Sequence, residues 1–473
     1  MRDIDTLKPA KSMRLACAVD ACALLVAASV ACVASASDFP ARDHGAVGDG
    51  RTDDTAAIQK AIDACSGAGG GRVVLDRGTY LIRPIMLKDG VDLHLERSAT
   101  ILASGNLHDY PSRGNLKTVI AENMPRGRDS ALITADAAHG VALTGEGTIN
   151  GNSEPFMELL PREEWGRWRY RRIGNNQFSP PRIVLFAGCS DVLVQGVTIT
   201  NQPACWAYMI HDCDRVNIDR AKVLSNIYHP NSDGIHINSS RDVTVSNCKV
   251  VAGDDAIVVR AQNRSFRERR PRASERVTVV NCNLRGHSNG IRLAWCRDGV
   301  MRDCTFSNCT ITDSCRGINI WAFDGAAAGD FGIDRTRVEN IVFSGIVMDR
   351  IHSYPITVVV GEPSESHCEA IRNLTFANLI CRAYAMPEFV GTRACPLENF
   401  TFTGCRFMRS DAPDVRPPWL GEREEWTRGK PPSAMKLGFR WGNGGDHANS
   451  ANPFHNCKGF TFNACSFDTE HED

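Results

Sequence analysis

The chain has 473 residues, of which 42% are hydrophobic and 23% charged, and its formal net charge is −1. This balance argues against a nucleic-acid or membrane-surface binder, since both usually carry a strong basic excess. The length could hold two or three ordinary domains, but repetitive folds also form single domains of this size.

The amino terminus has the pattern of a secretory signal. Lys8, Lys11 and Arg14 precede an apolar run, 21–33, which ends in the small residues 34–36. The run is too short to cross a bilayer. We therefore predict a signal peptide at 1–36 with cleavage after Ala36, a secreted or periplasmic mature chain, and no membrane attachment after cleavage.

The first predicted element of the mature chain is a short amphipathic helix at 53–65. Asp or Thr can cap its start, Gly67 lies beyond its end, and apolar residues recur on one face. The apolar positions are Ile58, Ala61, Ile62 and Cys65.

From residue 71 onward, a short strand-like segment recurs, and each copy is followed by Gly, Asn, Asp or Cys. Copies open at Val192, Val216, Val243, Val277 and Val300, at intervals of 24, 27, 34 and 23 residues. No helical pattern separates them, which leaves a sandwich, a propeller or a parallel β-helix. The irregular interval favours the β-helix, because a coil needs only about twenty-odd residues and insertions leave it as loops. Propeller blades repeat at about 40 residues or more.

We therefore predict an all-β solenoid in which residues 37–473 form a single domain and the helix plugs the open end of the first coil. Three long segments break the rhythm: 152–182, rich in aromatics and arginines; 264–276, which is basic; and 410–457, rich in Pro, Gly and Trp. Loops of this length are either functional or packed on the solenoid wall. Most arginines of 264–276 are interpreted as solvated.

Three of the 19 cysteines fall in the predicted signal, which leaves sixteen in an exported chain. Seven of them stand beside strand-like segments, which favours one small buried residue per coil over a disulfide framework. These are Cys189, Cys213, Cys248, Cys282, Cys304, Cys405 and Cys465. We expect one or two bridges among Cys296, Cys304, Cys309 and Cys315. No Cys-x-x-Cys pair supports a structural zinc site.

Polar motifs interrupt the repeat at about the interval of one coil: Asn231-Ser232-Asp233-Gly234, Gly253-Asp254-Asp255 and Gly286-His287. Asp254 follows Asp233 by 21 residues, so the two fall on neighbouring strands about 4.8 Å apart. His287 follows Asp255 by 32 residues, which is one coil plus the insertion 264–276. Gly253 allows the bend that both aspartates need, since adjacent residues of a regular strand point to opposite faces.

Carboxylates held this close together cannot all ionise, so one proton is retained near neutral pH and a general acid faces a general base. Hydrolysis of a glycosidic bond needs this division of labour. Two other interpretations stay open: each Asn or Asp is a turn residue bonded to its own backbone, or the three aspartates and His287 hold a divalent metal ion. The combination at coil spacing favours chemistry.

At these motifs the chain resembles glycoside hydrolase family 28, the polygalacturonase family of pectin-degrading right-handed β-helices. The similarity continues at 49–55 (Asp-Gly-Arg-Thr-Asp-Asp-Thr) and 145–151 (Gly-Glu-Gly-Thr-Ile-Asn-Gly), and it covers nearly the whole mature chain. It implies a right-handed parallel β-helix and inversion at the anomeric carbon. By motif, the resemblance implies that Asp254 protonates the leaving oxygen, Asp233 and Asp255 activate water, His287 tunes the acid or positions the sugar, and Asn231 orients the cluster.

The chain departs from the family pattern in three places. Ser232 replaces a threonine, two residues are inserted in Gly286-His287-Ser288-Asn289-Gly290, and the Arg-Ile-Lys motif that grips galacturonate is missing at Gly317-Ile318-Asn319-Ile320-Trp321. Either the sugar is neutral or differently decorated, or other arginines supply the cation. Candidate substrate-binding residues are Asn231, Arg260, Arg292, Asn319 and Trp321, with Arg316 and the arginine-rich loops as further sources of charge. Trp165, Trp168, Trp295 and Trp321 either stack on sugar rings or pack within the protein.

The sequence therefore predicts an inverting glycoside hydrolase acting on a pectin-type polysaccharide or oligosaccharide, a galacturonan or a rhamnogalacturonan. We expect it to need no cofactor and to act as a monomer. One alternative is a polysaccharide lyase or epimerase on the same scaffold, which would need calcium. Another is a non-catalytic carbohydrate-binding solenoid, since function lives in the site and not in the fold.

Overall fold

The computed structural model describes residues 37–111, 131–174, 178, 180–261, 268, 271–295, 298–322, 335–361, 367–416 and 454–470. The chain divides into two units, Met1–Ser37 and Asp38–Asp473. The predicted signal, 1–36, lies outside the described residues, and all that follows concerns the second unit. Within the described part of the chain, no helix is long and apolar enough to cross a membrane.

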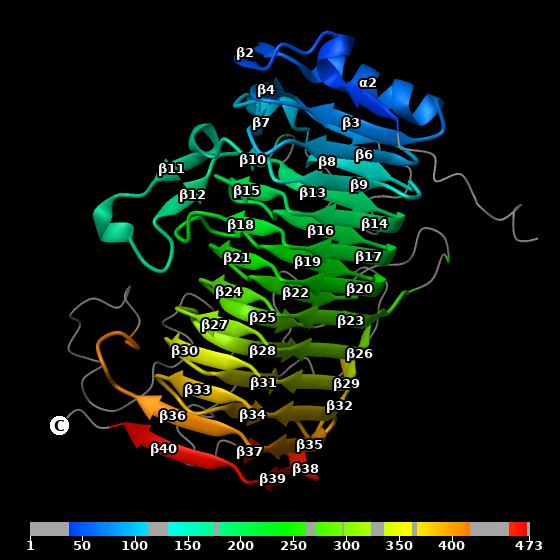
Figure 1. Cartoon of the computed structure of the whole chain (residues 1–473). Coiled ribbons are helices and arrows are strands. Elements are labelled where there is room, and N and C mark those ends of the chain that lie inside the picture. Colours follow the sequence, from blue (N-terminus) through cyan, green and yellow to red (C-terminus); the bar gives the residue numbers. More distant parts are fainter. Residues whose placement is uncertain are drawn as a thin grey trace, which may run out of the picture. The chain divides into compact units, whose positions relative to one another are not determined.

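Three long parallel sheets wind around one core, and each coil adds one strand to each sheet in turn (Figure 1). This is the predicted right-handed parallel β-helix. The first sheet, called sheet A, has 14 strands. They are β1 (Asp38–Pro40), β3 (Gly71–Leu75), β6 (Val91–Leu95), β9 (Ala142–Gly145), β14 (Ser190–Gln195), β17 (Asp214–Asp219), β20 (Arg241–Ser246), β23 (Ser274–Val280), β26 (Val300–Ser307), β29 (Thr336–Ser344), β32 (Cys368–Ala377), β35 (Leu397–Thr403), β38 (Cys457–Lys458) and β39 (Thr461–Asn463).

The second sheet, sheet B, has 13 strands. They are β2 (Asp49–Asp53), β4 (Gly78–Ile82), β7 (Ala99–Ala103), β10 (Thr148–Asn150), β15 (Thr198–Thr200), β18 (Lys222–Leu224), β21 (Lys249–Ala252), β24 (Asn283–Gly286), β27 (Thr310–Thr312), β30 (Val347–Ile351), β33 (Ile380–Ala383), β36 (Arg406–Ser410) and β40 (Ser466–Glu470).

The third sheet, sheet C, has 11 strands. They are β5 (Ile85–Leu87), β8 (Ala131–Asp136), β13 (Arg182–Ala187), β16 (Tyr208–His211), β19 (Ile235–Asn238), β22 (Ile257–Arg260), β25 (Asn289–Leu293), β28 (Arg316–Ala322), β31 (Ile356–Val360), β34 (Glu388–Val390) and β37 (Phe454–His455). The remaining elements are an antiparallel hairpin of β11 (Met157–Leu159) and β12 (Tyr170–Arg172), the helix α2 (Thr55–Gly67), and the 3-10 turns η1 (Ala41–His44), η2 (Leu107–Asp109), η4 (Glu154–Phe156) and η5 (Arg162–Glu164).

The core is built from columns of like side chains, because equivalent residues of neighbouring coils lie in register. In sheet A, Phe306, Phe343, Phe376 and Phe402 pair from strand to strand and are fully buried. Their ring centroids are stacked 5.0, 5.2 and 4.7 Å apart. The alternation of apolar and polar residues along each strand turns every second side chain outward, where a site can form.

The predicted register is confirmed for four coils and wrong for the fifth. Val192, Val216, Val243 and Val277 pair in succession. The flanking pairs of the next coil place Cys304 opposite Val277, and β26 begins four residues earlier, at Val300. The long strand β26 has an apolar residue near its start as well as at its centre, so the sequence pattern offered two registers.

The helix α2 is confirmed as the cap of the first coils, where Figure 1 shows it at the blue end of the solenoid. Ile58, Ala61, Ile62 and Cys65 are buried, as predicted. Asp54 holds the N-cap position, but its carboxylate accepts hydrogen bonds from the Val47 and Gly48 amides and none from the helix. Gly67 is the last helical residue rather than the first beyond it.

The buried cysteine column is confirmed, and the predicted bridges are wrong where they can be checked. Cys248, Cys282 and Cys309 occupy equivalent positions before β21, β24 and β27 and are free and buried. Cys304 and Cys315 are also free and buried, whereas Cys296 lies outside the described residues.

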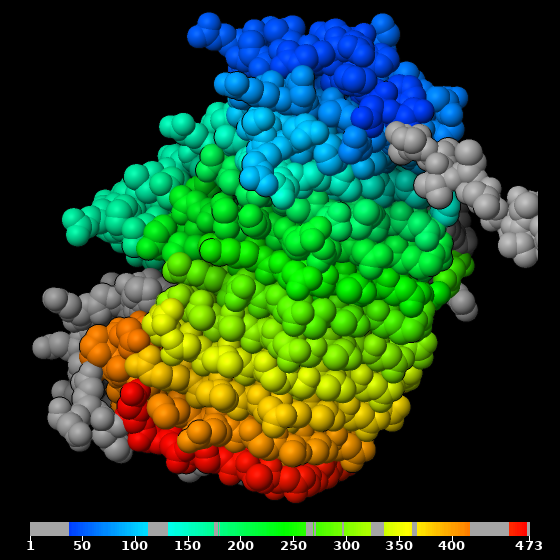
Figure 2. Space-filling model, in the orientation of Figure 1, coloured from blue at the N-terminus to red at the C-terminus, as the bar shows by residue number. Residues whose placement is uncertain are grey.

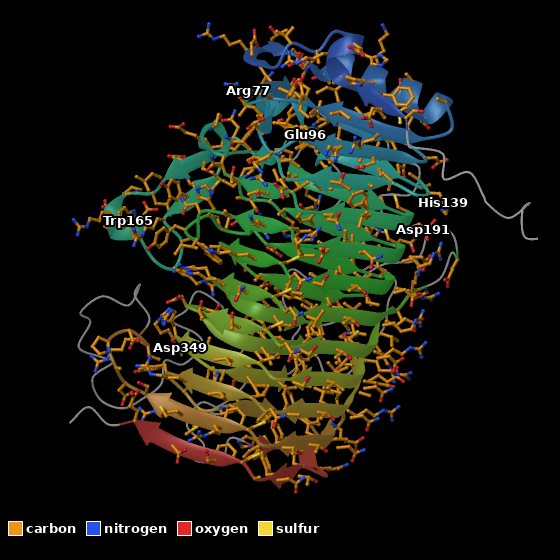
Figure 3. All side chains as sticks on the ribbon, in the orientation of Figure 1. Arg77, Glu96, His139, Trp165, Asp191 and Asp349 are labelled. Atoms are coloured by element: carbon orange, nitrogen blue, oxygen red, sulfur yellow. A yellow bond between two sulfur atoms is a disulfide. The ribbon has the colours of Figure 1, made fainter. Side chains whose placement is uncertain are left out.

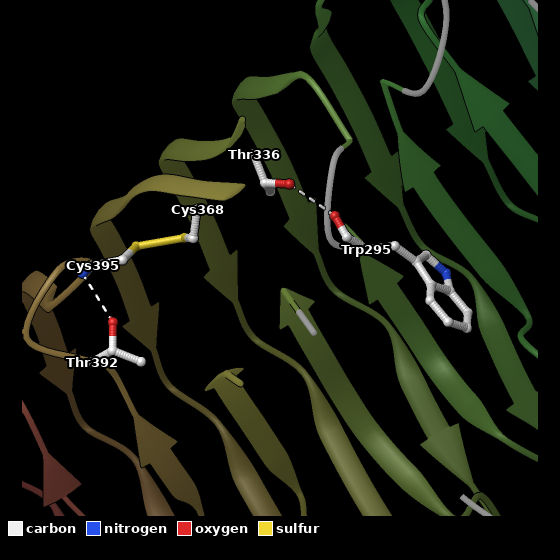
Figure 4. The surroundings of a disulfide bond; sticks show 5 residues. All are labelled: Trp295, Thr336, Cys368, Thr392 and Cys395. Carbon is white, nitrogen blue, oxygen red and sulfur yellow. Dashed lines mark hydrogen bonds between the residues drawn. A yellow bond between two sulfur atoms is a disulfide. The ribbon is translucent and has the colours of Figure 1, made fainter. Parts of the chain in front are cut away.

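The disulfide of the described chain joins Cys368 to Cys395, with Cα atoms 6.0 Å apart (Figure 4). The two cysteines are 27 residues apart in sequence, about one coil, so the solenoid brings them to adjacent levels. Cysteines close in sequence, such as Cys304 and Cys309, belong instead to different sheets or corners of the same coil.

The three predicted long loops have different outcomes. Residues 152–182 contain the β11–β12 hairpin, which stands out from the solenoid at the left of Figures 1 and 2, with Trp165 at its tip (Figure 3). Of 264–276, residues 264–267, 269 and 270 lie outside the described residues. Arg272 is buried and ion-paired with Asp212 and Asp214, so it is not solvated. Of 410–457, residues 417–453 lie outside the described residues.

Candidate active site

The predicted acids and the histidine meet at one corner of the solenoid, in the turns that lead from sheet B to sheet C. Asp233 lies between β18 and β19, Asp254 and Asp255 lie between β21 and β22, and His287 lies between β24 and β25. These are the same turns of three consecutive coils. The spacing of the motifs in the sequence therefore predicted their spatial order.

Backbone hydrogen bonds fix these turns on one another. The Gly234 N–H donates to the Asp255 carbonyl over 2.8 Å, and the Ser288 N–H donates to the Asp254 carbonyl over 3.1 Å. The bend that carries both aspartates depends on Gly253. A Cβ atom there would collide with the carbonyl oxygen of His229, so only glycine fits.

The three carboxyl groups affect one another and differ in exposure. Burial, together with the charge of the neighbouring Asp255, raises the pKa of Asp254 to about 6. Burial raises the pKa of Asp233 well above its usual range, and the charges of Asp254 and Asp255 add to this. Asp233 and Asp255 are each only 4% exposed, whereas Asp254 is half-buried and open to solvent. Asp254 is therefore the acid that can reach a bound molecule.

Asp255 is held by two partners from the next coil. The Asn289 amide donates a hydrogen bond to one of its oxygens, and Arg292 Nη1 lies 3.4 Å from the other. Asp233 is held by its own turn, where Asn231 Nδ2 lies 3.4 Å from its carboxylate. The structure thus brings Asn231, Asp233, Asp255 and Arg292 of the predicted site together. The arrangement offers one protonated carboxyl beside an ion-paired one, which is the requirement of acid and base catalysis.

His287 reaches the same corner but is fastened to the hairpin. Its Nε2 donates to the backbone carbonyl of Arg167 over 2.7 Å. Burial, together with the charge of Arg167, lowers the pKa of His287 to about 3. The imidazole is therefore neutral at ordinary pH, with the proton on Nε2.

The hairpin makes a second attachment at this corner. Trp168 Nε1 donates to the carbonyl of Gly253 over 2.9 Å, directly before the two aspartates. Arg167 is buried, and its charge opposes the rise in the pKa of Asp254. The sequence predicted a functional or packed loop here, and the loop packs directly onto the candidate site.

Two residues of the corner, His236 and Trp206, were not identified from the sequence. His236 Nδ1 lies 3.3 Å from the Asp233 carboxylate, and its ring is stacked on Trp206 with centroids 3.8 Å apart. Burial lowers the pKa of His236 well below its usual value, and Arg260 adds to this, so the ring is neutral. The available signal was the alternation Ile235-His236-Ile237-Asn238, which turns His236 outward on β19.

The predicted arginines lie on the outer face of sheet C. Arg260 forms a two-point ion pair with Asp298 at 2.7 and 2.8 Å, and Asp298 is a further residue that the sequence did not single out. The Arg292 guanidinium lies 3.6 Å from the ring centroid of Trp295 and 5.5 Å from that of Trp321. Asp298 therefore neutralises the charge of Arg260, whereas Arg292 lies beside Asp255 at the corner that carries the three aspartates.

The four candidate tryptophans have different environments. Trp295 and Trp321 are stacked on each other with centroids 5.9 Å apart, and Trp321 is only 8% exposed. The Trp295 carbonyl accepts a hydrogen bond from the Thr336 hydroxyl (Figure 4). Trp165 is exposed at the hairpin tip, and Trp168 is fixed by its bond to the corner. Packing thus accounts for Trp168 and Trp321.

Asn319 lies beside Arg292 on the next strand, β28, and is 2% exposed. Across the part of the chain that the structure describes, no group of three or more His, Cys, Asp and Glu side chains is arranged to hold a metal ion.

Comparison with known proteins gives a consistent result. Residues 111–381, more than half of the chain, match glycosyl hydrolases family 28, and residues 39–106 match the family described as rhamnogalacturonase A/epimerase, pectate lyase-like. A probable polygalacturonase of Arabidopsis thaliana is 25% identical over 343 residues, which cover 66% of this chain and 68% of that protein.

Solved structures share the fold. The exopolygalacturonase of Thermotoga maritima superposes with a TM-score of 0.64 at 21% identity, over 79% of this chain and 87% of that chain. The endo-xylogalacturonan hydrolase of Aspergillus tubingensis superposes with a TM-score of 0.54 at 16% identity, over 81% of this chain and 98% of that chain.

Proposed function

Because the chain belongs to glycosyl hydrolases family 28, we propose that it hydrolyses a pectin-type polysaccharide or its oligosaccharides, a galacturonan or a rhamnogalacturonan, with inversion. Membership of this family makes it a glycoside hydrolase acting on O-glycosyl bonds. The observation that carries the proposal is the half-buried Asp254, whose pKa of about 6 keeps a proton available beside Asp233 and Asp255.

In the proposed mechanism, Asp254 donates its proton to the glycosidic oxygen as the bond to the anomeric carbon breaks. Asp255 and Asp233 hold a water molecule and take its proton as its oxygen attacks the same carbon. Attack from the face opposite the leaving group inverts the configuration. Asn231 and Asn289 orient the two accepting carboxylates, and His287 holds the hairpin against the site.

The proposed substrate class rests on the chain's relatives and on Arg292. The relatives named above are a probable polygalacturonase, an exopolygalacturonase and an endo-xylogalacturonan hydrolase. Arg292 is buried beside Asp255 and can supply a cation where the family's usual motif is missing. It is therefore the residue that we propose to meet a sugar carboxylate.

We further propose that residues 1–36 are removed on export and that 37–473 act as a single monomeric catalytic domain outside the cell or in the periplasm. The support is the signal pattern of the sequence and the stacking of the described strands from β1 to β40 in the same three sheets. Sequencing the amino terminus of the exported chain tests this, with Ser37 as the expected first residue. An intact start at Met1 in the exported protein would contradict it.

Replacing Trp168 with phenylalanine is expected to lower kcat about tenfold with little change in KM. The variant keeps an aromatic ring but loses the hydrogen bond to the buried Gly253 carbonyl, and leaving such an acceptor unpaired costs about 1–3 kcal/mol. The bend that carries Asp254 is then held less firmly. Steady-state kinetics on polygalacturonate or rhamnogalacturonan measure the change.

The matched control for this experiment is Trp165→Phe, which makes the same chemical change within the same hairpin. The Trp165 indole donates to the carbonyl of Leu160, so its hydrogen bond lies inside the hairpin, whereas that of Trp168 reaches the turn of Asp254. Its variant is expected to keep kcat within about twofold of the wild type, because a bond at an exposed site contributes little. Equal losses in both variants would show that Trp168 only stabilises the hairpin.

A further inference from the structure

A row of polar side chains leads away from the catalytic corner along the outer face of sheet C. Arg292 on β25 pairs with Asn319 on β28, Asn319 pairs with Thr357 on β31, and Thr357 pairs with Glu388 on β34. The chain neighbours of these residues, such as Ile318 and Val358, belong to the core, so the row itself faces outward. With strands about 4.8 Å apart, the row extends about 14 Å from Arg292.

The first three members of the row have polar atoms that are not used within the described protein. Arg292 Nε and Nη2, Asn319 Nδ2 and Thr357 Oγ1 are buried and have no hydrogen-bond partner among the described residues. The three residues are 4%, 2% and 4% exposed. Buried polar groups are nearly always paired in folded proteins. Three unpaired groups in one column, starting at an active site, indicate a ligand that pairs with them.

The charge of the row changes sign along its length. Arg292 begins it with a cation that has one ion pair within the described part of the chain, to Asp255, at 3.4 Å. Glu388 ends it with a half-buried carboxyl group, and burial raises the pKa of this group. The charge of Arg316 opposes that rise, and Arg316 is itself only 5% exposed.

We propose that this row binds the sugar chain, with a uronic acid beside Arg292 and a neutral sugar beside Glu388. When Glu388 is ionised, a second uronic acid beside it would place two carboxylates together, which is unfavourable. A neutral sugar offers hydroxyl groups that hydrogen-bond to Thr357 and Glu388. The inference rests on the proposed function and narrows its substrate to chains in which acidic and neutral sugars alternate, as in rhamnogalacturonan.

Binding, rather than turnover, tests this row separately from catalysis. Calorimetry on the folded Asp254→Asn variant compares an oligosaccharide of alternating galacturonic acid and rhamnose with an oligogalacturonate of equal length. We expect the alternating chain to bind about tenfold more tightly. Adding Glu388→Gln removes the repulsion and brings the two affinities to within about threefold, chiefly by improving the binding of oligogalacturonate.

The matched control is Glu398→Gln, on sheet A, where Glu398 faces Lys458 away from the row. This variant keeps the tenfold preference. Thr357→Val weakens the binding of the alternating chain about fivefold, since it removes one hydrogen-bonding group and keeps the volume. Equal affinity for both oligosaccharides, absence of binding to either, or a preference unaffected by Glu388→Gln would overturn the inference.

The proposed function fails in a different way. If the wild-type enzyme releases no reducing ends from either oligosaccharide, hydrolysis is wrong as the activity, while the binding preference of the Asp254→Asn protein still decides whether the row is a sugar site. If the wild type hydrolyses the oligosaccharides but the Asp254→Asn protein binds both equally well, the proposed activity stands and the row is not a sugar-binding site.

Discussion

Replacing Asp254 with asparagine is expected to lower kcat about a thousandfold, within the range that general acid catalysis contributes. Asparagine has nearly the same shape and can keep its place in the turn, but it has no proton to give to the leaving oxygen. Asp254 is the member of the trio that is open to solvent, so the substrate is expected to meet this group first. Release of reducing ends, followed over time with purified wild type and variant, measures the loss.

The control for this loss is the same substitution at Asp191, which lies on sheet A at the right of Figure 3 and pairs with Arg215. Asp191→Asn should keep nearly full activity, because surface ion pairs contribute little to stability. Both variants should unfold at temperatures close to that of the wild type. An Asp254→Asn protein that keeps more than about a tenth of the activity would rule out Asp254 as the essential acid.

The activity is expected to fall as the pH rises through about 6, the pKa of Asp254. A general acid works only while protonated, so its working fraction declines about tenfold for each pH unit well above that pKa. At pH 8, kcat/KM should be about a hundredfold below its maximum. The midpoint belongs to the coupled trio of carboxyl groups and not to one residue alone.

The histidines of the corner cannot produce this decline. Burial lowers the pKa of His287 to about 3 and that of His236 well below its usual value, so both rings are already neutral at pH 6. The profile is measured as kcat/KM between pH 4 and 9, with circular dichroism at each pH to show that the protein stays folded. A rate that stays constant up to pH 8 would contradict the assignment of Asp254.

The repetitive part of the structure was predictable because its information is local. Short alternating strands separated by Gly, Asn or Cys at intervals near one coil define a β-helix, and the interval of 21 residues between Asp233 and Asp254 then places both at the same corner. Where a strand has two apolar positions, as β26 has, the local pattern leaves the register undecided. Val300 was misplaced for this reason.

Contacts between distant segments were not predictable from the pattern. The bond from Trp168 to Gly253 joins residues 85 positions apart, and the loop that carries Trp168 has no repeat to set its direction. The pairing of Arg260 with Asp298 likewise depends on the path of the chain between β25 and β26. The sequence therefore located the acids and left open what surrounds them.

Hydrolysis by the trio of aspartates is tested most directly by cleavage in water labelled with heavy oxygen, followed by mass spectrometry of the products. Polygalacturonate and rhamnogalacturonan oligosaccharides serve as substrates, with EDTA present. With the wild type, we expect one labelled oxygen on each new reducing end and no unsaturated product. With the Asp254→Asn variant, we expect no cleavage products of either kind. Unlabelled, unsaturated products that disappear with EDTA would show elimination, and the account of Asp254, Asp233 and Asp255 as acid and base for water would be wrong.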